Sequence, residues 1–253
     1  MADYNNTLQF QLPSKGLIYD NCTNDGFITI RSMTTEEEML RLSKSDRAYQ
    51  TMAQIMDACT VEGCGVSAYD MHIADYQYFL HRLRIVTYGK DYDLSTRCPY
   101  CGCYTEDTID LLDFPLKEIN LEELGKYIEF DLPVTKQHIR VRVQTPRMLD
   151  NIKVQLEDFK KRNPKVQLEY SLLFTVKSLI ETIDYQKPNP LFVEDWIKKL
   201  PMRDTDYIIK AAEKINESFG LETDLDVNCN VCGLSYKGDF KITQNFFRAR
   251  DDF

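Results

Sequence analysis

Hydrophobic and polar positions alternate over residues 8–12, and a second apolar run follows a turn, which predicts a β-hairpin over residues 8–30. The apolar positions of its two strands are Leu8, Phe10 and Leu12, then Phe27, Ile28 and Ile30. Pro13–Gly16 interrupts the alternation, and Asn24–Gly26 is typical of a tight turn. A similar alternation predicts a second hairpin over residues 127–143, and short strands are expected over residues 104–112.

Elsewhere the hydrophobic residues recur every three or four positions, which predicts helices. A first helix begins at Thr34 or Thr35, where Glu37 or Glu38 completes a capping box. The further apolar stripes comprise Met52, Ile55, Met56 and Cys59; Tyr69, Ile73, Tyr76, Leu80 and Leu83; Leu149, Ile152, Leu156 and Phe159; Leu172, Leu173, Val176, Leu179, Ile180 and Ile183; Val193, Trp196 and Ile197; and Ile208, Ala211, Ile215 and Phe219. Gly220 follows the last stripe, at the kind of position where a glycine commonly ends a helix.

The two halves of the chain follow a similar plan, which suggests an internal duplication. Phe10–Pro13 opens the first half and Phe130–Pro133 the second, each before an isoleucine-rich strand and a helix that carries Met-Leu. Each half also contains one Cys-x-x-Cys-Gly segment towards its end. Chance resemblance between α+β segments is the alternative, because few residues are identical.

These two segments, Cys98-Pro99-Tyr100-Cys101-Gly102 and Cys229-Asn230-Val231-Cys232-Gly233, carry the clearest chemistry in the sequence. One such turn supplies two thiolates, which is half of the tetrahedral shell that zinc prefers. The following glycine allows the positive φ with which backbone amides turn towards the sulfurs. Cys98, Cys101, Cys229 and Cys232 are therefore predicted to bind one structural Zn²⁺ as a split zinc ribbon. A Cys₄ shell leaves no open position for catalysis.

Several alternatives for the cysteines stay open. The two turns could be unrelated or redox-active, although a redox pair needs a helix start to lower a thiol pKa. Cys103 could replace Cys101 as a ligand. Cys59 falls on an apolar helix face and is expected to be a buried thiol. A second metal site built from Cys59, Cys64 and His72 is the other interpretation.

Together these features predict an α+β fold that is predominantly helical, with two β-hairpins and a split zinc ribbon. Residues 1–125 form a first portion with a hairpin, helices and the first zinc knuckle. Residues 126–253 form a second portion with a hairpin, helices and the second knuckle. The shared ribbon joins the two portions, so loss of zinc is expected to loosen both.

The composition is that of a soluble globular protein with little affinity for nucleic acid. Apolar residues make up 43% of the 253 residues, and the formal net charge is −9. The one dense basic run, Lys160, Lys161, Arg162 and Lys165, is interpreted as a solvated helix end. No apolar stretch approaches the roughly 18 residues of a membrane span, and the polar N-terminus is unlike a signal peptide. A reducing cytosolic setting is expected, in which metal binding explains the cysteines better than disulfides.

The sequence contains no recognisable catalytic motif. His72, His81 and His138 are scattered, and neither a phosphate-binding loop nor a Ser-His-Asp pattern is present. An enzyme would need a site assembled only in three dimensions, around His72 and His81 for example. The tail from Gln244 to Phe253 carries three phenylalanines, which either pack on the chain's own core or dock on a partner.

Three segments carry a resemblance to a known family: Leu12–Gly16 with Tyr19, Ile30–Glu38 and the Cys98–Gly102 knuckle. They resemble the baseplate hub proteins of T-even-type contractile-tailed bacteriophages. The chain length and the second knuckle are similar to those of the hub assembly protein of that group. The resemblance covers most of the chain and is clearest over residues 10–112. It implies a role in building the central hub without enzymatic activity, and only the knuckle cysteines map residue by residue.

The leading hypothesis is a non-enzymatic tail morphogenesis protein, either a chaperone-like assembly factor or a minor component of the baseplate hub. It would contact hub or tape-measure proteins in the host cytoplasm, with no membrane partner, and could remain in the tail baseplate of the virion. The acidic charge and aromatic content agree with protein–protein contacts. The alternative is a zinc-ribbon nucleic-acid-binding or transcription regulatory protein. The net charge and the scarcity of basic residues near the knuckles, apart from Arg97 and Lys237, argue against it.

Overall fold

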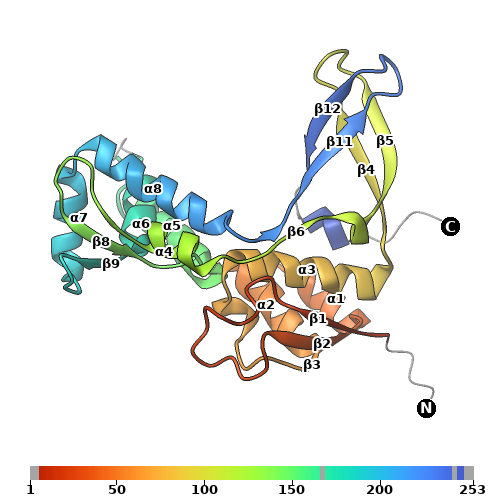
Figure 1. The fold of residues 1–253 in the computed structure, drawn as a ribbon, viewed down its shortest axis with the longest axis horizontal. Coiled ribbons are helices and arrows are strands. Elements are labelled where there is room, and N and C mark those ends of the chain that lie inside the picture. Colours follow the sequence, from red (N-terminus) through yellow and green to blue (C-terminus); the bar gives the residue numbers. More distant parts are fainter. Residues whose placement is uncertain (1–5, 166–168, 241–243, 248–253) are drawn as a thin grey trace.

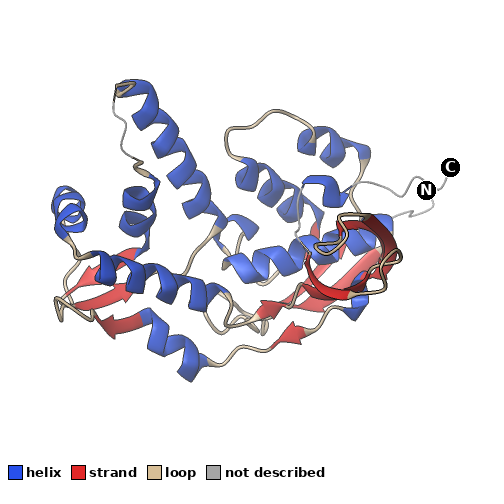
Figure 2. Ribbon diagram, turned by 90° about the horizontal axis from the view of Figure 1, so that it is seen from above, coloured by secondary structure: helices blue, strands red, loops and turns tan. Residues whose placement is uncertain are grey.

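The computed structural model describes residues 6–165, 169–240 and 244–247, which form two bodies and a projecting arm (Figure 1). The bodies lie at opposite ends of the long axis, and each has its own small sheet and helices (Figure 2). Two hydrophobic clusters fill the bodies, and a third, small cluster lies in the arm. The fold is therefore mixed α+β.

The first body begins with the predicted hairpin. Its elements are β1 (Thr7–Gln11), β2 (Phe27–Arg31), α1 (Thr35–Arg41), α2 (Ala48–Cys59), β3 (Thr60–Glu62), η1 (Ala68–Asp70) and α3 (Ile73–Tyr88). The strands form an antiparallel sheet in the order β1-β2-β3. Phe10, Ile28 and Ile30 face the core because alternate strand residues point to the same side. The apolar stripe of α3 lies against this sheet.

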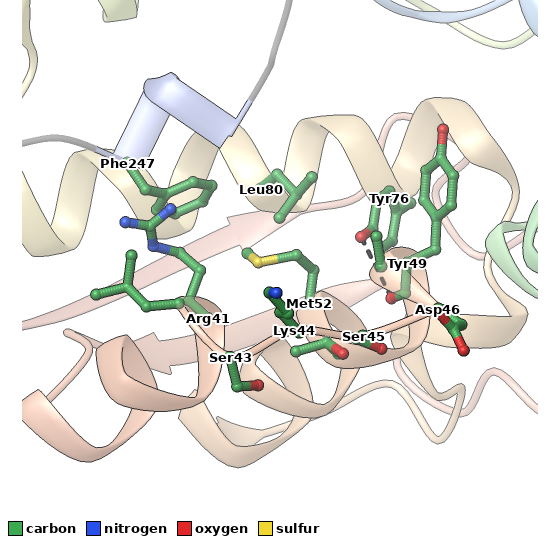
Figure 3. Close-up of a pocket in the computed structure, with 13 residues that line it drawn as sticks. Arg41, Ser43, Lys44, Ser45, Asp46, Tyr49, Met52, Tyr76, Leu80 and Phe247 are labelled. Carbon is green, nitrogen blue, oxygen red and sulfur yellow. Dashed lines mark hydrogen bonds between the residues drawn. The ribbon is translucent and has the colours of Figure 1, made fainter.

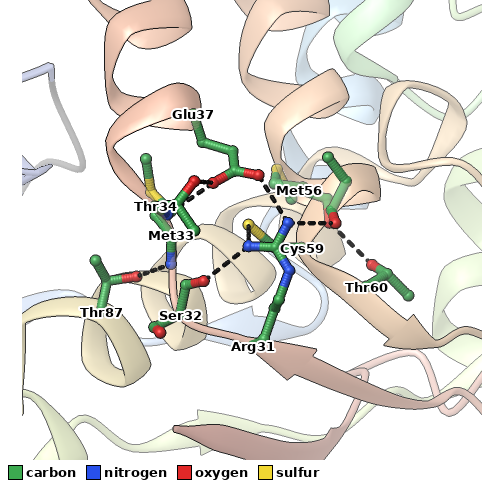
Figure 4. A network of polar contacts seen from close by, with 10 residues as sticks. Arg31, Ser32, Met33, Thr34, Glu37, Met56, Cys59, Thr60 and Thr87 are labelled. Atoms are coloured by element: carbon green, nitrogen blue, oxygen red, sulfur yellow. Dashed lines mark hydrogen bonds and ion pairs between the residues drawn. The ribbon is translucent and has the colours of Figure 1, made fainter. Parts of the chain in front are cut away.

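Arg31, the last residue of β2, ties the first sheet to the two helices that follow it (Figure 4). Its guanidinium pairs with Glu37 in α1 at 2.7 Å and donates to the carbonyl of Ala58 near the end of α2. The hydrogen bond from Arg31 is the main reason why the pKa of Glu37 falls to about 2. Glu37 also accepts from the backbone amide of Thr34 at 2.7 Å, which confirms the capping box predicted for this helix.

The second body contains α4 (Leu121–Ile128), β7 (Glu129–Asp131), β8 (His138–Val141), α5 (Pro146–Arg162), α6 (Ser171–Leu179), β9 (Ile180–Ile183), α7 (Pro190–Lys199) and α8 (Met202–Asn216). Its sheet is antiparallel in the order β7-β8-β9. The division expected between residues 125 and 126 falls inside α4, whose Leu124 packs in the second cluster.

The arm consists of two β-hairpins that come from distant parts of the sequence (Figure 1). One is β4 (Asp91–Arg97) with β5 (Tyr104–Asp110), and the other is β11 (Asp224–Asn228) with β12 (Ser235–Asp239). The short elements near its base are η2 (Leu111–Asp113), β6 (Leu116–Lys117), β10 (Gly220–Leu221) and η3 (Gln244–Phe247). Pairing of β6 with β10 holds together the chain segments that leave the first hairpin and enter the second.

Three expectations from the sequence need correction. The fold is not predominantly helical, because helices make up 44% of the described residues. The stripe from Leu172 to Ile183 is helical only to Leu179, and Ile180–Ile183 form β9, where β-branched residues suit a sheet edge. Gly220 does not end a helix, because α8 stops at Asn216. Gly220 has φ +115°, and a Cβ there would lie 2.9 Å from the Cβ of Ala74, so this glycine permits close approach to α3.

The two bodies repeat the same order of elements. Each has a hairpin, then helices, then a third strand that directly follows a helix, and then a long helix that leads to a hairpin with a knuckle. In each sheet the pairing of the second and third strands shifts register at one place, between Thr29 and Ile30 and between Arg140 and Val141. This agreement in element order and in irregularity supports the internal duplication that the sequence suggests.

One buried aspartate in each body holds the turn that follows the Phe-x-Leu-Pro motif. Asp75, in the first turn of α3, accepts a hydrogen bond from the backbone amide of Ser14 at 3.0 Å. Asp204, in the first turn of α8, accepts from the amides of Val134 and Thr135 at 2.8 and 3.0 Å. Both aspartates are fully buried. A helix N-terminus is a favourable place for an acidic side chain. The first turn of the long helix therefore carries the buried aspartate in both bodies.

We expect Asp204→Ala to lower the free energy of unfolding by roughly 2–4 kcal/mol, because two backbone amides lose their acceptor. Urea denaturation at neutral pH measures this change. Asp206→Ala, on an exposed position of the same helix, is the control and should change stability by less than about 0.5 kcal/mol. Equal effects of the two substitutions would contradict the role assigned to Asp204.

Candidate metal centre

Each Cys-x-x-Cys-Gly segment closes one hairpin at the tip of the arm. In each turn the glycine amide donates to the carbonyl of the first cysteine at 2.9 Å, from Gly102 to Cys98 and from Gly233 to Cys229. The two glycines have φ of 75° and 70°, as their position after the second cysteine predicts. The two turns are therefore local copies of one another.

The two turns bring four sulfurs together although they are far apart in sequence. The Sγ atoms of Cys98 and Cys232 are 3.8 Å apart, and those of Cys101 and Cys229 are 3.6 Å apart. All four lie within 4.8 Å of one another. A tetrahedral ion with metal–sulfur bonds of about 2.3 Å needs sulfurs separated by about 3.8 Å. The cluster could hold one metal ion, and no other such group of His, Cys, Asp or Glu occurs among the described residues.

The surroundings of Cys229 and Cys101 shift the pKa values of their thiols in opposite directions. Amides of Cys232 and Val231 donate to the sulfur of Cys229 and lower its pKa to about 6. At Cys101 the amide of Cys103 acts in the same direction, but local desolvation of the sulfur and hydrogen bonds with the three neighbouring thiols together raise the pKa to about 12, although the residue itself is exposed. Four thiolates at these distances would repel one another without a cation among them. A divalent ion removes that repulsion and deprotonates its thiol ligands.

The cluster stands on a small core inside the arm. Cys98 and Cys229 are buried with Val227 and Tyr236, whereas Cys101 and Cys232 lie on the outside. The hydroxyl of Tyr236 lies 2.7 Å from that of Thr96, which links the two hairpins directly. This core is too small to hold the hairpins together strongly, so a shared metal ion would be their main connection.

Arg84, which the sequence pattern did not identify, anchors the base of the arm. Its fully buried guanidinium donates to the carbonyl oxygens of Gly89 at 2.8 Å, Asp91 at 3.5 Å and Phe246 at 2.9 Å. It therefore joins the end of α3, the start of β4 and η3. The one available signal is a basic residue next to Leu83 on the apolar stripe of α3.

The remaining candidate residues do not join this centre. Cys59 is a buried thiol, as predicted, and burial raises its pKa to about 11. It forms no metal-ligand group with Cys64 and His72 in the described part of the chain. His72 accepts from the amide of Ala74 at the start of α3. His81 is surrounded by aromatic rings, including that of Phe114. Both histidines are thus parts of the core of the first body.

Burial lowers the pKa of His72 to about 3 and that of His81 to about 4. Unfolded histidine titrates near 6.5. Below that pH the unfolded chain binds more protons than the folded chain, so the free energy of unfolding decreases as the pH is lowered. We expect each histidine to cost about 2 kcal/mol between pH 7 and pH 5. His81→Phe should remove about 2 kcal/mol from the loss of unfolding free energy between pH 7 and pH 5, as measured by urea denaturation at the two pH values. An unchanged pH dependence would contradict the neutral state of His81.

The described part of the tail and the basic run lie apart from the knuckles. Phe246 and Phe247 pack in the core of the first body, while Phe253 lies outside the described residues. The basic residues Lys160, Lys161, Arg162 and Lys165 are exposed at and beyond the end of α5, as expected of a solvated helix end.

A groove of about 600 Å³ runs between the α1–α2 connection, α3 and η3 (Figure 3). Arg41 and Lys44 lie at one side, and Met52, Leu80 and Phe247 provide apolar surface. Neither His72 nor His81, around which the enzyme hypothesis would place a site, lines this groove.

A comparison with known protein families gives a match for this chain. Residues 5–248 match the family described as T4 bacteriophage base plate protein. The chain belongs to this family. A search of curated proteins and one of solved structures give no significant match. The resemblance to T-even-type baseplate proteins is confirmed at the level of the family, and a place in the tail baseplate follows from it. No helix in the described part of this baseplate protein is long and apolar enough to cross a membrane.

Proposed function

We propose that this baseplate protein is a non-enzymatic assembly factor or minor component of the central hub. It acts through protein–protein contacts with hub or tape-measure proteins, and it is made and used in the host cytoplasm. The observation that carries the proposal is the family match over nearly the whole chain. The knuckles, the one metal-ligand cluster among the described residues, offer four thiols and so leave no coordination position for a substrate.

We further propose that Cys98, Cys101, Cys229 and Cys232 hold one structural Zn²⁺. The sulfur spacing fits a tetrahedral ion, and an all-cysteine shell is typical of structural zinc. Zinc there would clamp the hairpin of residues 1–125 to that of residues 126–253. The repeated order of elements supports the view that these two portions derive from one duplicated unit.

A phage from which this chain has been deleted tests the hub role. Infected cells should accumulate tail intermediates without a complete hub, and expression of the wild-type chain should restore tails. Electron microscopy of the particles and a count of infectious phage measure the result. Tails assembled in normal number and form without the chain would refute a hub role.

Protein analysis of purified particles then separates the two versions of the proposal. A component of the hub remains in the particle at a fixed number of copies, whereas an assembly factor is needed for the tail but is absent from it. Complementation with Cys229→Ser tests in the same system whether the metal centre is needed for assembly.

A further inference from the structure

The tip of the arm carries large apolar side chains that are exposed in the described structure. Tyr100, Tyr104, Val231 and Leu234 are 63, 70, 66 and 50% exposed. They come from the two knuckles, and Figure 1 shows the loops that carry them at the end of the arm, away from both bodies. Exposed apolar groups gathered on one projecting tip are typical of a contact site.

The turns that carry two of these side chains also carry the four clustered sulfurs. Tyr100 lies between Cys98 and Cys101, and Val231 occupies the equivalent position between Cys229 and Cys232. The hydrogen bonds of each turn fix the backbone on either side. A contact surface that is already ordered loses little conformational entropy on binding, so the tip is suited to insert into a preformed pocket.

The strands below the tip are strongly acidic. Residues 91–110 and 224–238 carry seven carboxylates and two basic side chains, Arg97 and Lys237, which gives a formal net charge of −5 out of −9 for the whole chain. Asp110 pairs with Lys90 and Asp226 with Lys237, and Asp91 and Asp93 also have interactions of their own. Glu106 and Asp107 are exposed on β5 and have no ion pair among the described residues.

This charge restricts the kind of partner that can approach. Nucleic-acid phosphates would be repelled, and a second copy of the chain would bring an equally acidic arm. A protein surface with lysine and arginine around an apolar pocket matches the acidic strands and the apolar tip together. Building on the hub role proposed above, we propose that the arm docks tip-first into such a basic, apolar-centred pocket on another baseplate protein.

The two parts of the arm then have different effects on binding. The tip side chains, buried in the pocket, set how long the complex lasts, because central aromatic and aliphatic anchors carry most of an interface's binding energy. The acidic strands at the rim raise the rate of association and make it fall with added salt. Substitutions at the two places should therefore be distinguishable by kinetics.

The test uses baseplate hub assemblies purified from cells infected with phage that lack this chain. The full-length chain is added, and association and dissociation are measured at several salt concentrations. Tyr100→Ser with Val231→Ser should weaken binding at least about tenfold through faster dissociation. Glu106→Gln with Asp107→Asn should slow association by about fivefold and reduce its salt dependence.

Matched variants elsewhere separate the arm from general surface effects. Tyr185→Ser with Leu191→Ser removes two apolar side chains that are at least as exposed, in the second body. Asp158→Asn with Glu213→Gln removes two exposed carboxylates from α5 and α8. These controls should bind within about twofold of the wild type. All variants must retain the wild-type metal content and unfolding midpoint.

Three results would overturn the docking inference. Binding by the tip variant as tight as that of the wild type would remove the arm from the interface and leave the hub role intact. Self-association of the wild type that the tip substitutions abolish would make a second copy the occupant. No binding of the wild-type chain to the hub assemblies would end the docking inference, whereas the hub role stands or falls with the assembly of tails by the deletion phage.

Discussion

Cys229→Ser is expected to abolish binding of one equivalent of zinc and to lower the free energy of unfolding by on the order of 5 kcal/mol. Cys229 is buried, and its thiolate would be one of the four charges that the ion neutralises. Structural zinc sites contribute their binding energy to folding, but the two bodies here have cores of their own. The loss should therefore unfold the arm first and the bodies only partly.

Zinc content by mass spectrometry and thermal unfolding measure the two effects. Hydrogen exchange should rise most strongly in β11 and β12, because the core of the arm is small. A chelator added to the wild-type chain should reproduce the behaviour of the variant. Arm protection that survives complete loss of zinc would contradict the clamp.

Cys103→Ser is the matched control, because Cys103 follows the first knuckle directly and is the alternative ligand. Its sulfur is not one of the four that lie within 4.8 Å of one another. The variant should keep one zinc and the wild-type stability within about 1 kcal/mol. If Cys103→Ser lost zinc while Cys101→Ser retained it, the ligand set would have to be revised.

The two knuckles could be predicted because each has a short sequence motif and offers only two of the four ligands that a structural zinc ion needs. The spacing of two cysteines and a glycine predicts the conformation of each turn. Each turn could supply only half of a zinc shell. A zinc shell of four ligands would need both turns, which predicts that these segments, more than 120 residues apart, meet; their sulfurs do lie together, and the zinc itself stays a prediction. The β1–β2 hairpin was predictable for a similar reason, since its alternation and its turn residues agree.

The strands that precede the knuckles gave a much weaker signal. In β4 the residues run Asp-Tyr-Asp-Leu-Ser-Thr-Arg, and in β11 Asp-Leu-Asp-Val-Asn, so few positions are apolar. An arm of two hairpins buries little surface, and its strands need few hydrophobic residues. The opposite difficulty arises at Ile180–Ile183, where a run buried in a sheet has the same composition as a buried helix.

Buried charges escape sequence patterns altogether. In the sequence Asp75 and Asp204 look like solvated acidic residues at the start of a helix. The fold shows that they accept hydrogen bonds from backbone amides of a turn far away in the sequence. Arg84 is similar, because its acceptors are main-chain carbonyls, which no sequence motif marks. Sequence patterns predict single helices and strands, whereas these residues make the contacts between them.

Arg84→Met is accordingly expected to lower the free energy of unfolding by roughly 3–5 kcal/mol. Methionine retains much of the volume but cannot donate to the carbonyl groups of Gly89, Asp91 and Phe246. The carbonyl of the buried Phe246 loses its charged donor, whereas those of the exposed Gly89 and Asp91 can turn to water. Denaturation in urea measures the change in stability, and zinc content should stay at the wild-type level because the knuckles lie at the far end of the arm.

Hydrogen exchange shows whether Arg84 acts as an anchor of the arm or merely as part of the core. Exchange should increase in β4 and η3, where two of its acceptors lie, and stay unchanged in β7 and β8 of the second body. Arg82→Met is the control, because Arg82 donates to the hydroxyl of Tyr78 on its own helix and joins no second element through that bond. It should cost less than about 1 kcal/mol. An exchange increase of similar size in both bodies would mean that Arg84 supports the whole fold, whereas a local increase identifies it as the joint between the arm and the first body.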